Sequence, residues 1–170
     1  MKINLKKGIL AMNKNLSVKF IAVNAIIAGV YAAITLALSP IAYLEIQFRL
    51  SEVMVFLSFY NKKYILGLVI GCLIANIPSP LGLMDVVFGT ISTLLVCIAM
   101  YYLKNRYVAA FVGAVITGLI IGAQLHLIFE IPFVINAIYV FIGQFIVLVI
   151  GARLFKVIEN NKQLRPYLME

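Results

Sequence analysis

The sequence predicts an all-α integral membrane protein with six transmembrane helices, of which the second and third are short. Three observations lead to this fold class. Hydrophobic residues make up 64% of the 170 positions, and charged residues only 12%. Apolar runs recur that are long enough to cross about 30 Å of hydrocarbon. Of the 14 Lys and Arg residues, 13 lie at the chain ends or in alternate connections between the runs, as expected when basic residues collect in cytoplasmic loops.

The first helix is predicted over residues 20–38, after a basic cytoplasmic segment at residues 1–19. Small residues recur every four positions along this helix, and others lie beside them. Such spacing allows another helix to approach closely, which is a main route to helix association in lipid. The sequence therefore predicts a partner-docking ridge on the first helix, made of Ala25, Ala28, Gly29, Ala32, Ala33 and Ala37.

The stretch "YLEIQFRLSE" at residues 43–52 is unusually polar for this chain. Glu45, Gln47 and Arg49 alternate with Ile46, Phe48 and Leu50, a period of two that indicates an extended segment. Ser51 is a candidate N-cap and Glu52 would lie in the first turn of a second helix over residues 52–60. Nine residues reach only about 14 Å, so this helix cannot cross the bilayer alone. Extended backbone at this depth must be packed in protein or line a watery cavity.

The remaining four helices follow from the apolar blocks at residues 64–77, 86–103, 107–129 and 133–154. Asn76 ends the third helix, and Asp85 begins the fourth, where capping is an alternative to ligand contact. Asn136, Tyr139, Gly143 and Gln144 are spaced to share one face of the sixth helix. The membrane domain is expected to span residues 20–156 and a cytoplasmic tail residues 157–170.

The placement of charge predicts that both termini are cytoplasmic. Basic residues occupy the two ends of the chain and the loops at residues 62–63 and 104–106, whereas the other three connections hold Glu45, Arg49, Glu52, Asp85 and Glu130. Arg49 is thus the one basic residue expected on the outer side. Polar groups inside membranes are costly and usually mark a ligand site or pathway. We therefore expect a pocket in the outer half of the membrane.

Several classes of function have no support in the sequence. Cys72 and Cys97 fall in apolar helices, where cysteine usually acts as a small hydrophobe, so neither a disulfide nor a metal site is expected. His126 has no cluster of partner ligands. No glycine-rich phosphate loop occurs, so the chain should not hydrolyse a nucleotide itself. No nucleophile with a base is evident, so an enzyme is not expected.

The stretches "IQFRLSE" at residues 46–52, "GCLIAN" at 71–76 and "GLMDVVFGTISTLL" at 82–95 resemble the QueT family. These are substrate-binding S components of energy-coupling factor (ECF) importers. The resemblance implies six transmembrane helices in a prokaryotic cell membrane and capture of a queuosine precursor, a 7-deazaguanine base such as preQ0 or preQ1. It implies no cofactor, no nucleic acid, and three protein partners: a transmembrane coupling subunit and two cytoplasmic ATPases.

A deazaguanine offers adjacent N–H donors, a carbonyl acceptor and, when aminomethylated, a cation. Carboxylates suit the donors and the cation, whereas arginine or amide groups suit the carbonyl, with Phe48 or Tyr139 stacking on the ring. The candidate substrate-binding residues are Glu45, Gln47, Arg49, Glu52, Asn76, Asp85, Glu130, Asn136, Tyr139 and Gln144. Two alternatives remain open at this point: an S component for another vitamin-like molecule, and a self-sufficient small secondary transporter.

Overall fold

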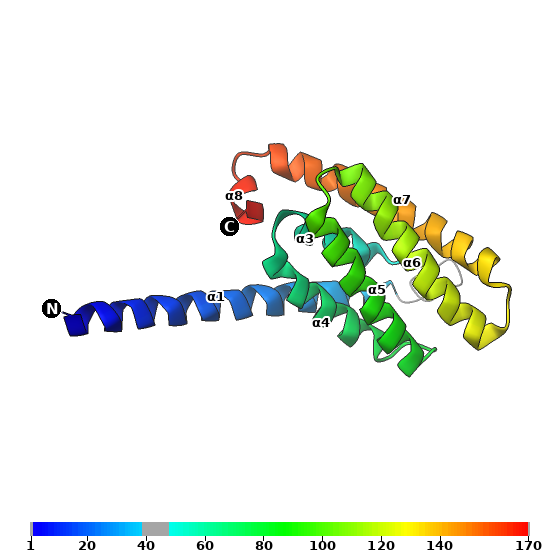
Figure 1. The fold of residues 1–170 in the computed structure, drawn as a ribbon, viewed down its shortest axis with the longest axis horizontal. Helices are drawn as coiled ribbons and strands as arrows, with labels where there is room; N and C mark the ends of the chain where they lie inside the picture. Colours follow the sequence, from blue (N-terminus) through cyan, green and yellow to red (C-terminus); the bar gives the residue numbers. More distant parts are fainter. Residues whose placement is uncertain (1, 39–47, 170) are drawn as a thin grey trace.

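The computed structural model describes residues 2–38 and 48–169, and these residues form helices and turns without a strand. The all-α class is therefore confirmed. Figure 1 shows the order of the elements along the chain. They are α1 (Lys2–Ala37), η1 (Leu50–Val55), α3 (Phe56–Tyr60), η2 (Lys62–Tyr64), α4 (Ile65–Asn76), α5 (Leu83–Tyr102), α6 (Arg106–Phe129), α7 (Phe133–Asn160) and α8 (Arg165–Met169).

Four of these helices contain apolar stretches long enough to cross a bilayer, at Val18–Ala37, Leu83–Tyr102, Arg106–Phe129 and Phe133–Asn160. Large apolar side chains such as Ile26, Leu119 and Ile146 are exposed along them, as expected where lipid replaces water. The chain is therefore a multi-pass membrane protein. The 12 residues of α4 reach about 18 Å, so a count of six spans stays a prediction, as does the cytoplasmic location of the termini.

The helix α1 is much longer than predicted. It begins at Lys2 and continues to Ala37 without interruption, so the basic segment at residues 2–19 continues the first transmembrane helix. Residues 2–19 lack proline and hold a single glycine, which leaves little to stop a helix. In Figure 1 the N-terminal part of α1 projects well beyond the other helices.

The second predicted helix starts earlier than expected, and its first part is a 3-10 helix, which is wound more tightly than an α-helix. Arg49 is extended, with φ −89° and ψ 94°, and the chain then forms the 3-10 helix η1 from Leu50 before α3 begins at Phe56. The prediction of an extended backbone is confirmed at Arg49 and is wrong at Leu50, while Glu45, Ile46 and Gln47 lie outside the described residues. Ser51 is also not the N-cap, because that position belongs to Arg49.

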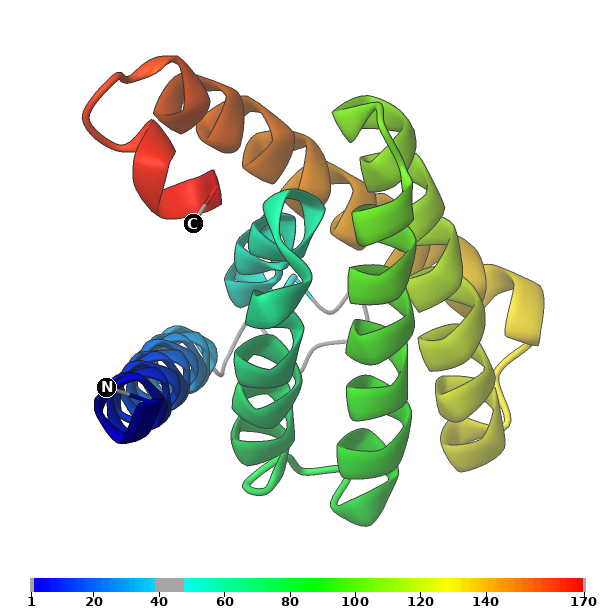
Figure 2. The same cartoon turned by 60° about the vertical axis from the view of Figure 1, so that its left-hand side comes forward.

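Helices α4, α5, α6 and α7 lie next to one another in chain order, and α1 packs beside α4 (Figure 2). Glycines allow the closest approaches. A side chain at Gly67 would meet Asn24, and one at Gly71 would meet Ala28, so α1 and α4 run in the same direction. On the other side of the bundle, Gly122 of α6 packs directly on Ala137 of α7.

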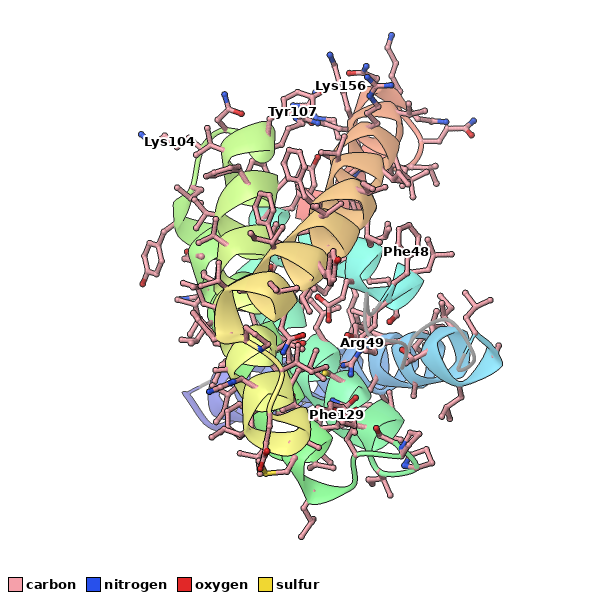
Figure 3. All side chains as sticks on the ribbon, turned by 90° about the vertical axis from the view of Figure 1, so that its right-hand side faces the viewer. Phe48, Arg49, Lys104, Tyr107, Phe129 and Lys156 are labelled. Atoms are coloured by element: carbon pink, nitrogen blue, oxygen red, sulfur yellow. The ribbon has the colours of Figure 1, made fainter. Side chains whose placement is uncertain are left out.

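The two ends of the bundle differ in character. Lys104 and Lys156 lie at one end and Phe129 at the other, with Arg49 between them (Figure 3). At the basic end, Nη2 of Arg106 pairs with Oε2 of Glu159 at 2.7 Å, which joins the start of α6 to the end of α7. The hydroxyl of Tyr60 donates to the same oxygen at 3.1 Å.

Candidate functional site

A buried polar cluster lies inside the bundle, and the first of its two carboxylates is Glu52 on η1. Its side chain is 4% exposed. Oε1 accepts hydrogen bonds from the hydroxyls of Tyr31 on α1 and Thr93 on α5, the latter at 3.0 Å, and Oε2 accepts one from Nε2 of Gln144 on α7 at 3.3 Å. One carboxylate therefore ties four separate elements together.

The second carboxylate, Asp85, lies in the first turn of α5 and is fully buried. Oδ2 accepts hydrogen bonds from the hydroxyl of Ser79 and, at 3.5 Å, from Nη2 of Arg49; Oδ1 accepts from Nε2 of Gln124 on α6 at 2.5 Å. The alternative that Asp85 caps α5 is not supported, because Gly82 occupies the N-cap position. The carboxylate instead holds the Arg49 guanidinium inside the bundle.

A very small cavity of about 10 Å³ adjoins these groups, which is about enough room for one water molecule. This volume is far below the range usual for ligand pockets. Glu52 and Arg49 line the cavity, and Asp85 does not. The lining residues are Arg49, Glu52, Gly89, Ser92, Thr93, Thr117, Ile121 and Gln144.

Gly89 and Asn76 shape one wall of the cavity. A side chain at Gly89 would collide with the amide nitrogen of Asn76 and would come within 3.3 Å of Nη1 of Arg49. The Asn76 amide donates to Sγ of Cys72 at 3.4 Å, while its carbonyl oxygen is buried without a donor. The carbonyl oxygen of Gln124 is likewise buried without a donor. Among the described residues, neither of these two oxygens has a hydrogen-bond donor, an arrangement that buried polar groups normally avoid.

Five of the ten candidate substrate-binding residues belong to this cluster: Arg49, Glu52, Asn76, Asp85 and Gln144. Glu45 and Gln47 lie outside the described residues. The other three candidates lie apart from the cluster.

Asn136 is buried but donates to the backbone oxygen of Ile131 at 3.4 Å, at the turn between α6 and α7. Glu130 is an exposed residue that ends α6 in the left-handed conformation, with φ 58°. Tyr139 is 49% exposed. The prediction that Tyr139 shares a face with Asn136 and Gln144 is therefore wrong, because those two side chains point inward and Tyr139 points outward.

The sequence did not identify several partners in the cluster as site residues: Tyr31, Ser79, Thr93 and Gln124. Hydroxyl side chains in apolar helices are weak signals, because they often bond to the backbone of their own helix, as the hydroxyl of Thr35 does to the oxygen of Tyr31 at 2.9 Å. A glutamine in an apolar run is a stronger signal. Gln124 could have been found by that criterion.

The predicted docking ridge on α1 divides between two faces. Ala28 and Ala32 are buried, at 5% and 6% exposure, on the face that packs within the bundle. Ala25, Gly29, Ala33 and Ala37 are exposed. A side chain at Gly29 would have nothing within 4 Å, so this part of the helix surface has no partner among the described residues.

Comparison with known proteins identifies a family for the chain. A family model described as "QueT transporter" matches residues 21–160. A protein of Lactococcus lactis subsp. cremoris (strain MG1363), named "Queuosine precursor transporter QueT", is 35% identical over 144 residues, which cover 75% of this chain and 85% of that protein. No solved structure matches the chain.

Proposed function

The chain belongs to the QueT transporter family, whose members are transporters and not enzymes, and on that premise we propose that it is the substrate-binding S component of an ECF importer for a queuosine precursor. The ligand would be a 7-deazaguanine base. The chain would bind it in the membrane of a prokaryotic cell and deliver it with the help of a coupling subunit and two cytoplasmic ATPases.

The observation that carries this proposal is the separation of two surfaces. The polar cluster around Glu52 and Asp85 is enclosed by the bundle, whereas the small-residue surface at Gly29 and Ala33 faces outward from α1. A self-sufficient transporter needs no such docking surface, while a binding subunit that acts through a partner does. An exposed row of small residues suits close packing against another membrane helix.

The binding step is supported by the groups that line the cavity. Glu52 and Gln144 offer acceptors to the N–H groups of a deazaguanine, and the Arg49 guanidinium offers donors to its carbonyl. The unsatisfied oxygen of Asn76 is a further acceptor next to the Gly89 wall. Because the cavity has room for about one water molecule, we expect the helices around it to move apart when a ligand enters.

The decisive experiment separates docking from binding. Gly29→Leu adds a bulky side chain to the exposed surface, at a position where a Cβ atom would have no described atom within 4 Å. We expect it to abolish uptake and co-purification with the coupling subunit in cells that express the whole importer, while the purified variant binds 7-deazaguanine ligands with wild-type affinity. Gly29→Ala is the matched control and should keep both properties.

Two outcomes would contradict the proposal. If vesicles that contain only this chain accumulated the ligand, the chain would be a self-sufficient transporter. If Gly29→Leu lost ligand binding together with uptake, the surface on α1 would serve the fold rather than a partner.

A further inference from the structure

We infer that Glu52 is the counter-ion for a positively charged ligand, so that the site selects an alkylammonium-bearing heterocycle over an uncharged analogue of the same shape. This inference rests on the proposed function and deepens it. Glu52 would distinguish an aminomethyl deazaguanine, which carries a positive charge at neutral pH, from the cyano and hydroxymethyl forms, which do not.

The first argument is the charge balance of the bundle interior. Within residues 18–38 and 48–166, the buried charged side chains are Arg49, Glu52 and Asp85. Their formal charges sum to −1. A net charge inside a membrane protein is costly unless an opposite charge compensates it. A ligand that carries one positive charge would balance the charge of these three described side chains.

The second argument identifies which carboxylate lacks a cation. Asp85 forms an ion pair with Arg49 at 3.5 Å. Glu52 takes part in none of the ion pairs between described residues, and its three hydrogen-bond donors, Tyr31, Thr93 and Gln144, are all neutral. Among the described residues, the carboxylate of Glu52 is therefore held by neutral donors and forms no ion pair.

The third argument is access. Both carboxylates accept hydrogen bonds on both oxygens, but Glu52 lines the cavity and Asp85 does not. A ligand ammonium entering the cavity would meet Glu52. Asp85 is instead a positioning residue, which keeps the guanidinium of Arg49 at the cavity wall.

The test compares two ligands of nearly equal size on the purified full chain in lipid nanodiscs by calorimetric titration. These are 7-aminomethyl-7-deazaguanine, a cation, and 7-hydroxymethyl-7-deazaguanine, which is neutral. We expect the wild-type protein to bind the cation at least about tenfold more tightly, as charge-assisted hydrogen bonds are stronger than neutral ones. Glu52→Gln keeps the size and the acceptor oxygen of the side chain and should reduce the preference to about twofold or less.

Glu159→Gln is the matched control, because this carboxylate lies at the basic end of the bundle, paired with Arg106. It should leave the preference unchanged. Equal affinity of the wild-type protein for both ligands would overturn the inference and leave the proposed function standing, and this comparison needs no variant to fold. A preference that survives in Glu52→Gln would also overturn the inference. Absence of binding of either ligand to folded protein would overturn the proposed function itself.

Discussion

At the scale of single residues, the main feature is the ion pair between Arg49 and Asp85, with side chains 6% and 0% exposed. Arg49 lies just before η1 and Asp85 in the first turn of α5, so the pair connects two segments 36 residues apart. Spacing along the chain would favour pairing of Arg49 with Glu52, about one helical turn away. The ion pair with Asp85 is a long-range contact that local spacing could not reveal.

This pair predicts a specific pattern of stability. Breaking a buried ion pair by removing one partner typically costs about 3–5 kcal/mol, since the remaining charge stays buried and uncompensated. Arg49→Ala and Asp85→Ala should therefore each lower the thermal midpoint of the detergent-solubilised protein by many degrees. The double variant should recover a large part of that loss.

Thermal unfolding of the two single variants and the double variant, without ligand, measures this coupling. Additive losses in the double variant would contradict the pair as a structural unit. Because Arg49 also lines the cavity, ligand titration of the stabler double variant is expected to show weakened binding even where folding has recovered.

At the scale of elements, α1 has two faces with different roles. One face packs tightly against α4, where a side chain at Gly71 would come within 2.8 Å of Cβ of Tyr31 and 2.9 Å of the backbone oxygen of Ala28. Nearby, the backbone N–H of Gly67 donates to Oδ1 of Asn24 at 2.7 Å. The other face, at Gly29, is open.

The two faces predict opposite effects for the same substitution. Gly71→Ala should lower the thermal midpoint, because overpacking a tight contact costs about 1–3 kcal/mol. Gly29→Ala should leave the midpoint unchanged or raise it slightly, because alanine favours a helix by up to about 1 kcal/mol over glycine. Thermal unfolding of both variants in the same detergent is the measurement, and a greater loss in Gly29→Ala would mean that α1 packs differently.

At the scale of the whole molecule, the basic residues set the expected orientation in the membrane. Lys104 and Lys156 lie at one end of the bundle (Figure 3), and Arg106 pairs with Glu159 there. Basic ends of membrane proteins face the cytoplasm. We therefore predict that both termini are cytoplasmic and that the α4–α5 and α6–α7 connections are outside.

Cysteine labelling in sealed cells checks this orientation. Both native thiols are buried, and Cys72→Ala and Cys97→Ala would remove them so that each protein holds a single cysteine. That cysteine would replace Pro80 in one variant and Lys104 in another. A membrane-impermeant reagent should label the cysteine at position 80 and leave the one at position 104 unmodified until the cells are opened. Labelling at position 104 in intact cells would contradict the predicted orientation.

The sequence by itself determined the helical membrane class, the approximate positions of the long helices and five members of the polar cluster. These inferences rest on local properties: the length of an apolar run, and the cost that makes polar residues rare in lipid. The predicted ranges for α5, α6 and the start of α7 agree with the structure to within a few residues. The assignment of all ten candidates to substrate binding stays a prediction.

Only the tertiary structure decided how the polar residues divide. It separated Glu52, with neutral donors, from Asp85, paired with Arg49, and it turned Tyr139 outward while Gln144 points inward. It also divided the small residues of α1 between an internal and an open face. Spacing along a helix tells which residues share a side, but the rotation and approach of neighbouring helices decide what that side contacts, and these depend on packing among residues far apart in the chain.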